Sequence, residues 1–213
     1  MGQVNYFKSL LEEAGLDEEE EEHLRSLISQ KNYFGVEDLV RKQNISEELS
    51  QVFLELPQLF GSSEVLEKAR TLTTNEKALK AVERLEEIYE ILKLYGYEKY
   101  ISFDFGMLSK YRYYTGIIFQ AYTYGTGEPL IKGGRYDTLM KHFGKPAAAV
   151  GFAIVVDSLM AALSRQKIQQ SKEEEITVIH YSRDDRAEAV KQAQKLRAEG
   201  RAVALRLKKE TEV

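Results

Sequence analysis

Three short blocks in the second half of the chain carry the side chains best suited to chemistry. Residues 109–116 read Ser-Lys-Tyr-Arg-Tyr-Tyr-Thr-Gly, residues 133–137 read Gly-Gly-Arg-Tyr-Asp, and residues 151–158 read Gly-Phe-Ala-Ile-Val-Val-Asp-Ser. Tyrosine hydroxyls and ring faces can orient a small polar ligand without any catalytic role. The blocks therefore indicate a recognition site. The alternative is that Tyr114 is one more strand aromatic in a tyrosine-rich sheet.

The glycines and charged residues of the second block have simpler explanations. Gly133-Gly134 is explained by backbone crowding or a bend in a sheet more readily than by a phosphate cradle. Arg135 and Asp137 flank Tyr136, and we favour a structural ion pair or a turn-forming role for them over ligand contact.

The composition excludes several kinds of site. Cysteine is absent, so disulfides and thiolate chemistry are excluded. The three histidines, His23, His142 and His180, are too scattered to suggest a metal cluster. We therefore expect no metal and no cofactor.

Charge and hydropathy bear on partners and location. A net charge of -4 gives no long-range attraction for a polyanion, so a nucleic-acid partner is not favoured. Local basic groups at Lys208-Lys209, or at Lys141, His142 and Lys145, are the alternative, although such groups are more often solvated faces. There is no apolar run of about 18 residues and no secretory signal. We expect a soluble, cytoplasmic protein with no membrane partner.

The first part of the chain, residues 1–70, is expected to be helical. An apolar helical face stops at Gly15, a typical helix C-terminus, and the acidic run 18–22 then opens a second helix. Negative charge in a first turn complements the helix dipole, which is a better explanation than a metal site or a site for a basic partner.

A more regular helix follows. Thr73 stands three residues before Glu76, which is the spacing of a capping box. Apolar residues then recur at intervals of three and four before Gly96, and they are Leu79, Val82, Leu85, Tyr89 and Leu92. The sequence therefore predicts an amphipathic helix.

A hairpin is predicted after this helix. Alternating residues at 101–105 predict a half-buried strand, and residues 113–124 predict a longer one. Gly125-Thr126-Gly127 tolerates positive φ, and an extended run resumes at 130–131. Together these features predict antiparallel pairing.

The following residues complete the first domain. A short helix is expected at 136–141, and the apolar residues 148–154 predict a central strand that is buried on both faces. A helix with Leu159, Met160 and Leu163 comes next. Helices combined with antiparallel strands indicate the α+β class.

The end of the chain is predicted to form one βαβ unit, with strands at 176–181 and 202–207 around a helix at 184–198 that ends near Gly200. Parallel pairing is expected. Fewer than about 40 residues do not normally hold a core alone, so the unit should lean on the first domain or begin a larger one.

These elements define three regions. Residues 1–165 are predicted to form one domain, the polar stretch 166–175 a linker, and residues 176–213 the start of a second domain.

From about residue 4 to residue 207, the order of features resembles histidyl-tRNA synthetases, in the second half of their catalytic domain and the start of their anticodon-binding-like domain. Within that group the chain resembles the regulatory subunit of ATP phosphoribosyltransferase, a synthetase paralogue of histidine biosynthesis. The resemblance rests on Tyr-Tyr-Thr-Gly, Gly-Gly-Arg-Tyr-Asp and Gly-Phe-Ala in that order. It implies a class II synthetase-like fold. The earlier synthetase blocks are missing, so we expect a fragment or a reduced form.

The resemblance places a histidine pocket at Tyr114 and Tyr136. Further residues that could line the pocket are Ser109, Arg112, Lys132 and Arg135.

The charges around this pocket differ from those of the synthetases. Ser109 and Ser158 stand where the synthetases have arginines, Arg112 stands in place of an aspartate, and Lys132 in place of a small residue. A long cation at Lys132 would crowd or recharge the pocket. Losing one preorganised positive donor typically costs about 100- to 1000-fold in rate. We therefore expect no catalytic residues.

By resemblance, the chain is expected to be a non-catalytic regulatory subunit. It would bind the catalytic subunit of ATP phosphoribosyltransferase in a hetero-oligomer, self-associate, and respond to free L-histidine as an effector. The alternatives are a fragment of an active histidyl-tRNA synthetase and a synthetase-like scaffold that recognises RNA or another enzyme.

Overall fold

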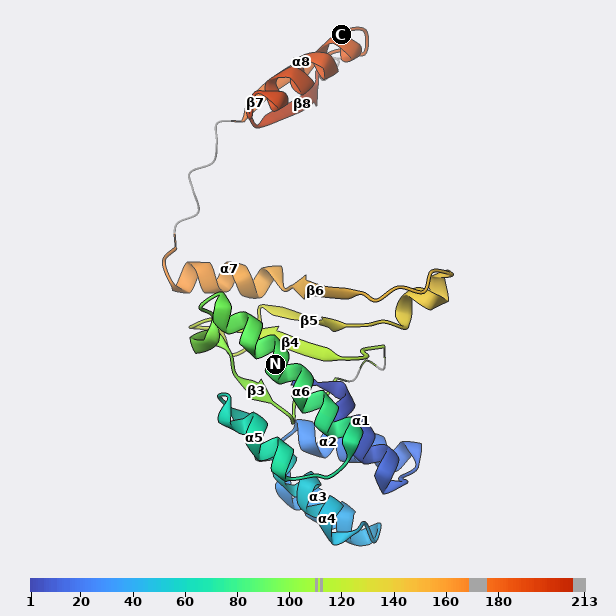
Figure 1. Ribbon diagram of the computed structural model, residues 1–213. Coiled ribbons are helices and arrows are strands. Elements are labelled where there is room, and N and C mark those ends of the chain that lie inside the picture. The colour runs from blue at the N-terminus through green and yellow to red at the C-terminus, as the bar shows by residue number, and fades with distance from the viewer. Residues whose placement is uncertain (110, 112, 169–175, 209–213) are drawn as a thin grey trace. The chain divides into compact units, whose positions relative to one another are not determined.

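The computed structural model describes residues 1–109, 111, 113–168 and 176–208 (Figure 1). The chain forms two compact units, Met1–Ala162 and Leu163–Val213. Residues 169–175, which make up most of the predicted linker, lie outside the described residues, as do residues 209–213. The predicted division at residues 165 and 176 therefore stays a prediction.

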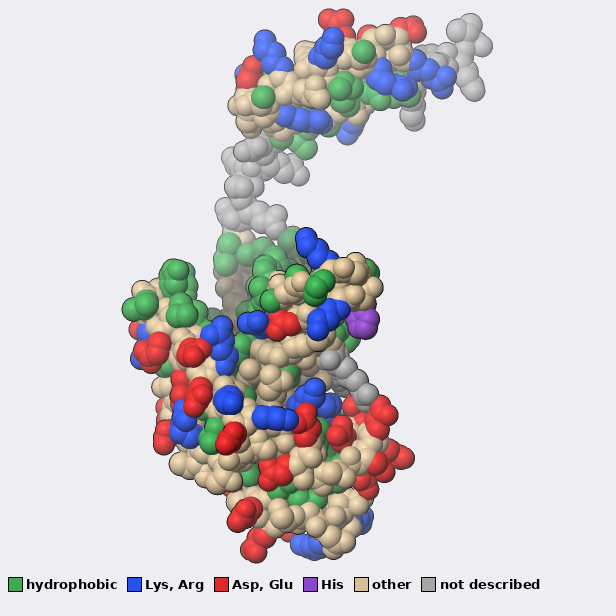
Figure 2. All heavy atoms as spheres, turned by 45° about the vertical axis from the view of Figure 1, so that its right-hand side comes forward, with side chains coloured by type: hydrophobic (Ala, Val, Ile, Leu, Met, Phe, Trp, Pro, Cys, Tyr) green, Lys and Arg blue, Asp and Glu red, His purple; other side chains and the backbone are tan. Residues whose placement is uncertain are grey.

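The first unit begins with a bundle of helices, as predicted. These helices are α1 (Val4–Ala14), α2 (Glu18–Ser29), α3 (Tyr33–Lys42), α4 (Glu47–Glu55), α5 (Glu64–Thr71) and α6 (Glu76–Leu94), with a 3-10 turn at Leu56–Gln58. Gly15 ends α1 in the left-handed region at a φ of 65°. Asp17 and Glu20 form a capping box at the start of α2, so the acidic run opens this helix as expected. Acidic side chains gather on the surface of this helical part (Figure 2).

The main hydrophobic core joins these helices. Tyr6 and Phe7 of α1 are almost completely buried, and Tyr6 packs edge-on against Phe105 with ring centroids 4.7 Å apart. The Tyr6 hydroxyl donates a hydrogen bond to the Ala69 carbonyl at 2.9 Å, so its burial leaves no unpaired donor. Each fully buried side chain of this size stabilises the fold by about 1.5–3 kcal/mol.

Helix α6 is confirmed, but its predicted capping box is wrong. Asn75 is the N-cap, and its side-chain oxygen accepts hydrogen bonds from the backbone of Lys77 and Ala78. Thr73 instead accepts from the Asn75 N–H. An amide oxygen one residue before the helix reaches the free N–H groups directly, whereas Thr73 lies two residues further out.

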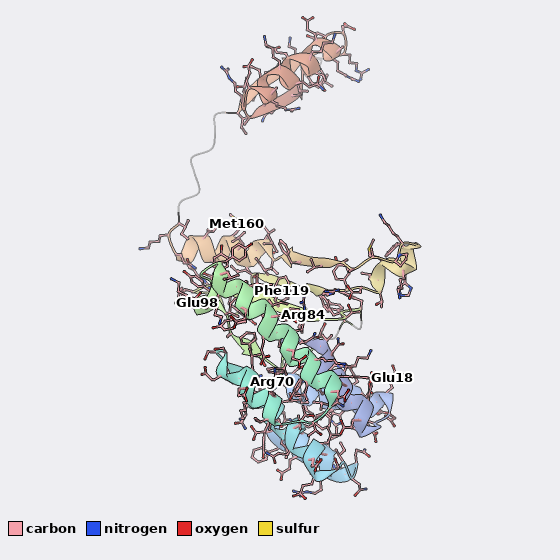
Figure 3. The ribbon with its side chains drawn as sticks, viewed as in Figure 1. Glu18, Arg70, Arg84, Glu98, Phe119 and Met160 are labelled. Atoms are coloured by element: carbon pink, nitrogen blue, oxygen red, sulfur yellow. The ribbon has the colours of Figure 1, made fainter. Side chains whose placement is uncertain are left out.

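Two ion pairs fasten α5 to α6. Arg70 of α5 lies 2.5 Å from Glu86 and 3.8 Å from Glu83 (Figure 3). The Arg70 side chain is 34% exposed, so solvent screens both pairs and their contribution to stability is modest.

Four strands form the main antiparallel sheet, in the order β1-β4-β5-β6. They are β1 (Gly2–Gln3), β4 (Ile117–Ala121), β5 (Ile131–Arg135) and β6 (Val150–Ile154). A separate pair joins β2 (Phe60–Gly61) to β3 (Phe103–Asp104). Helices with antiparallel strands confirm the α+β class for this unit.

The predicted hairpin is confirmed, since β4 pairs with β5 and Gly125 adopts a φ of 83° in the connection. The predicted strand at 113–124 is too long at both ends. The Tyr113 and Tyr114 rings lie 4.5 Å apart. Neighbouring side chains of a strand point to opposite faces, so this contact requires a turn before Ile117.

The prediction of a central, doubly buried strand at 148–154 is wrong. Within the described residues β6 pairs only with β5 and forms the edge of the sheet, with Val150 71% and Phe152 63% exposed. An apolar run shows that a strand could be buried, but it does not show whether a neighbouring strand is present to bury it. The short helix expected at 136–141 is a 3-10 turn at Leu139–Phe143, and α7 (Val156–Arg165) follows β6.

The second unit contains the predicted βαβ arrangement. Strands β7 (Thr177–Tyr181) and β8 (Val203–Leu207) pair in parallel around α8 (Arg186–Ala198). Ala189 and Ala193 are the buried residues of α8, and Gly200 follows this helix at a φ of 84°. In the part of the chain that the structure describes, no helix combines the length and apolar character needed to cross a membrane.

The N-cap of α6 can be tested by substitution. Asn75→Ala should lower the free energy of unfolding by about 1–2 kcal/mol, because two backbone N–H groups lose their acceptor. Thr73→Ala should cost about 0.5 kcal/mol, since a single hydrogen bond is lost. Urea denaturation of both variants measures the difference. A larger loss in Thr73→Ala would contradict the assignment of the cap.

Candidate functional site

Four tyrosine rings gather at the entry to β4 and the exit from β5. Tyr113 lies 4.5 Å from Tyr114, 5.4 Å from Tyr111 and 5.8 Å from Tyr136, measured between ring centroids. Tyr114 and Tyr136, the two predicted histidine-binding residues, lie 6.4 Å apart at an interplanar angle of 61°. The sequence blocks that contain these residues therefore meet in space, and we name Tyr111, Tyr113, Tyr114 and Tyr136 the tyrosine cluster.

Backbone and hydroxyl bonds lock the first two blocks together. The Thr115 N–H donates to the Arg135 carbonyl at 2.9 Å, and the Thr115 hydroxyl accepts from the Asp137 N–H at 2.9 Å. The Tyr136 N–H donates to the Ala149 carbonyl at 2.8 Å, which ties in the segment before β6. These bonds fix Tyr114 and Tyr136 at one end of the sheet.

Arg135 and Asp137 form the predicted ion pair. The Arg135 Nε lies 2.9 Å from both carboxylate oxygens of Asp137, and the aliphatic part of Arg135 covers Gly116, where a Cβ would lie 3.2 Å from Cδ. The side chains are 44% and 36% exposed, so the pair contributes little to stability. Its main effect is to orient the turn that carries Tyr136.

The remaining predicted lining residues occupy different positions. Lys132 pairs with Gln120 and Ala153 in the sheet and is exposed. It stands two residues from Gly134, so its side chain leaves the same face of β5 roughly 7 Å along the strand.

The Ser109 hydroxyl accepts a hydrogen bond from the Tyr111 N–H at 3.0 Å. Ser158 lies in the first turn of α7. Arg112 lies outside the described residues.

The glycines of β5 show on which side of the sheet the tyrosine cluster lies. A Cβ on Gly134 would meet the Tyr114 ring, whereas a Cβ on Gly133 would meet Phe119 and Phe152. Consecutive residues point to opposite faces, so the tyrosine cluster and Phe119 lie on opposite sides of the sheet. The explanation of Gly133-Gly134 by backbone crowding is thereby confirmed.

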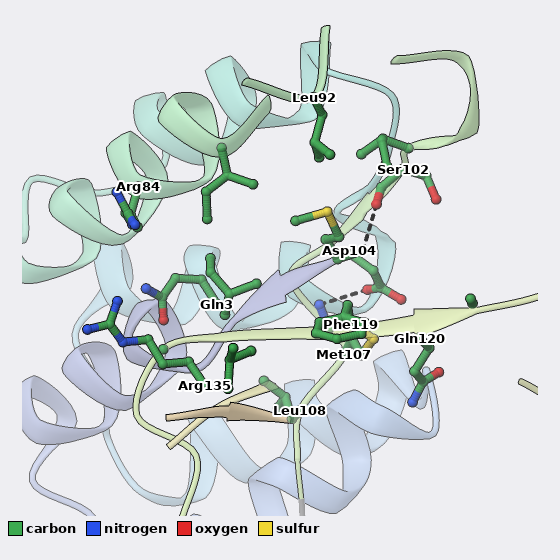
Figure 4. A pocket seen from close by; sticks show the side chains of 18 of the residues that line it. Gln3, Arg84, Leu92, Ser102, Asp104, Met107, Leu108, Phe119, Gln120 and Arg135 are labelled. Atoms are coloured by element: carbon green, nitrogen blue, oxygen red, sulfur yellow. Dashed lines mark hydrogen bonds between the residues drawn. The ribbon is translucent and has the colours of Figure 1, made fainter. Parts of the chain in front are cut away.

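A cavity of about 1320 Å³ lies on the Phe119 side, between the sheet and α6 (Figure 4). Arg84 and Arg135 lie at one end, and Asp104 lies at the other. Both arginines are paired, Arg84 with Glu87 at 2.6 Å and Arg135 with Asp137, so neither offers an unpaired charge to an anion. Neither Tyr114 nor Tyr136 lines this cavity, and the cluster remains the better candidate for recognition.

The electrostatic environment of the cluster is set mainly by burial. Burial, followed by a hydrogen bond with Tyr113, raises the pKa of Tyr114 from 10.0 to about 12. The Tyr114 hydroxyl is therefore a neutral donor and acceptor at physiological pH. Among the described residues, no group of three or more His, Cys, Asp and Glu side chains is placed to hold a metal ion.

Residues 1–159 match the family model described as histidyl-tRNA synthetase, which is well over half of the chain. The chain belongs to the histidyl-tRNA synthetase family. The predicted class II synthetase-like fold is confirmed. The matched range includes the three sequence blocks on which the predicted resemblance rests.

Two relatives of the chain have names that are more specific than the name of the family model. The chain is 42% identical over 203 residues to the ATP phosphoribosyltransferase regulatory subunit of Acetivibrio thermocellus, covering 95% of this chain and 49% of that protein. It is 41% identical over 202 residues to the subunit of the same name from Clostridium kluyveri, covering 94% and 52%. The chain spans about half the length of these curated relatives.

A solved structure agrees with these sequence matches. The crystal structure of an ATP phosphoribosyltransferase regulatory subunit/histidyl-tRNA synthetase from Bacillus halodurans matches with a TM-score of 0.69 at 33% identity. The match covers 100% of this chain and 54% of that one. The predicted resemblance to regulatory subunits is confirmed.

Some residues of the site were missed by reasoning from sequence. Tyr111 and Tyr113 belong to the cluster, and a Cβ on Gly151 of β6 would collide with the Tyr136 hydroxyl. The signal for the tyrosines was the density of aromatic residues at 111–114. The role of Gly151 has no signal of its own, because it depends on the register between β5 and β6.

The environment of Tyr114 predicts a pH dependence. The raised pKa stabilises the fold fully below pH 10, and this contribution is lost as the pH rises from 10 to about 12. In a titration of tyrosinate absorbance, Tyr114→Phe should remove a component that ionises near pH 12. The control Tyr124→Phe, at a side chain that is 89% exposed, should leave that component in place. Loss of the component in the control alone would refute the assignment.

Proposed function

We propose that the chain is part of a non-catalytic regulatory subunit of ATP phosphoribosyltransferase, required for the first step of L-histidine biosynthesis and its feedback regulation. The observation that carries the proposal is the identity of about 40% to regulatory subunits over nearly the whole chain. The catalytic subunit is the partner in a hetero-oligomer, and L-histidine is the effector. Catalysis resides in that partner.

Histidine is recognised at the tyrosine cluster. The side chains of Tyr114 and Tyr136 supply two hydroxyls and two ring faces, and the two ring centroids lie 6.4 Å apart. These groups suit a neutral imidazole. Lys132 leaves the same face of β5 and supplies the positive charge for the ligand carboxylate. Of the two expectations for Lys132, that it would crowd or recharge the pocket, this role takes the second, because the side chain is exposed.

The same site is unsuited to adenylate formation. Attack of the histidine carboxylate on the α-phosphate of ATP, with pyrophosphate leaving, needs fixed positive charge on the carboxylate and phosphate oxygens. The Ser109 hydroxyl is engaged by the Tyr111 N–H, and it carries neither the charge nor the bidentate fork of an arginine. Ser158 has the same deficit. Two missing donors of this kind would lower the rate by roughly 10⁴-fold or more.

The competing function is aminoacylation of tRNA by a longer synthetase, since the Bacillus halodurans relative carries both names. Histidine-dependent exchange of pyrophosphate into ATP, measured on the full-length protein, separates the two. The proposal predicts histidine binding without exchange. Robust exchange would show that the serines do not abolish catalysis and would overturn the regulatory assignment.

Removal of one ring tests the binding site. Tyr136→Ala should weaken histidine binding at least about tenfold, the effect of losing roughly 1.4 kcal/mol of ring and hydroxyl contact. Tyr124→Ala is the matched control, because this tyrosine is 89% exposed and lies outside the cluster. Isothermal titration with L-histidine measures both variants. An equal affinity in Tyr136→Ala and the parent protein would exclude the cluster as the binding site.

A further inference from the structure

At two glycines, one on β5 and one on β6, an added Cβ would collide with a tyrosine of the proposed pocket. We propose that Gly134 and Gly151 are positioning residues, whose missing side chains let Tyr114 and Tyr136 lie close against the sheet. The inference rests on the proposed function for the identity of the ligand. The positions of the rings themselves can be measured without any ligand.

Gly134 accommodates the ring of Tyr114. A Cβ on Gly134 would lie 2.6 Å from Cε1 and 2.7 Å from Cδ1 of Tyr114, and 2.8 Å from the Ile117 carbonyl oxygen. These distances are well inside van der Waals contact. Any side chain at residue 134 would therefore push the ring away and also press on the backbone of β4.

Gly151 accommodates the hydroxyl end of Tyr136. A Cβ on Gly151 would collide with the Tyr136 hydroxyl oxygen, while Cε1 and Cζ would remain at 3.3 Å. The obstruction is the tip of a movable side chain, so the ring can swing away and leave the backbone in place. A substitution at Gly151 should therefore displace Tyr136 at little cost to stability.

Gly133 provides a matched control on the opposite face. Its Cβ would lie 2.5 Å from the Gly151 carbonyl oxygen, 2.6 Å from the Phe152 Cβ and 2.7 Å from the Phe119 Cζ. None of these atoms belongs to the tyrosine cluster. A Cβ on Gly133 would therefore crowd β5 and β6 without meeting the rings of the tyrosine cluster.

Gly151 places one residue of β6 beside the proposed pocket. Gly134 and Gly151 are direct partners in the register between β5 and β6, so the two rings rest on adjacent points of one strand pair. Because β6 is the edge strand of the described sheet, its position is the less constrained of the two.

The experiment compares Gly151→Ala, Gly134→Ala and Gly133→Ala by near-ultraviolet circular dichroism, urea denaturation and titration with L-histidine. Gly151→Ala should keep its stability, change the tyrosine dichroism, and bind histidine at least about tenfold more weakly. Gly134→Ala should change the dichroism and also lose stability. Gly133→Ala should lose stability, yet while folded keep the dichroism and bind histidine within about twofold of the parent.

A double variant shows whether the hydroxyl contact is the cause. In the Tyr136→Phe variant the colliding oxygen is absent and the ring carbons would lie 3.3 Å from the new methyl group, so adding Gly151→Ala should change the dichroism only slightly further. A full additional change there, or equal effects of Gly133→Ala and Gly151→Ala on the dichroism, would overturn the inference. Absence of histidine binding by the parent protein would instead defeat the proposed function, and the dichroism would still decide the positioning roles.

Discussion

The hydrogen bonds that join Thr115 to the end of β5 hold the candidate site together. The Thr115 backbone donates to Arg135, and its hydroxyl accepts from Asp137, both at 2.9 Å. Asn5 of α1 donates to the Thr115 carbonyl at 3.1 Å, so the helical part is fastened to the same residue. Each bond contributes only about 1 kcal/mol to stability. Their greater effect is to bring Tyr114 and Tyr136, which are distant in sequence, into one cluster.

The proposed function separates recognition from reaction. Aromatic groups that face a small ligand need only a fixed position, and the interlocked blocks supply it. Adenylate formation needs fixed cations as well, and the uncharged side chains of Ser109 and Ser158 do not supply them. A protein that keeps the first requirement without the second can bind an amino acid and leave chemistry to a partner. The names of the relatives that are 41–42% identical to the chain agree with this proposed division.

Local patterns predicted much of the fold. Helix α6, the hairpin and the βαβ unit follow from periodicity and turn residues, which act within a few positions of the chain. The edge position of β6 could not be predicted, because Val150 and Phe152 would look the same with or without a neighbouring strand. Within the site, Tyr114 and Tyr136 came from the resemblance. Gly151 required the strand register, which is a long-range property.

Regulation requires that histidine and the catalytic subunit each change the affinity of the protein for the other. The direct measurement is calorimetric titration of the full-length protein with L-histidine, in the presence and absence of the ATP phosphoribosyltransferase catalytic subunit. A regulatory subunit should give dissociation constants that differ by about fivefold or more, corresponding to a coupling free energy of at least ~1 kcal/mol. Identical constants in the two titrations would contradict a regulatory role.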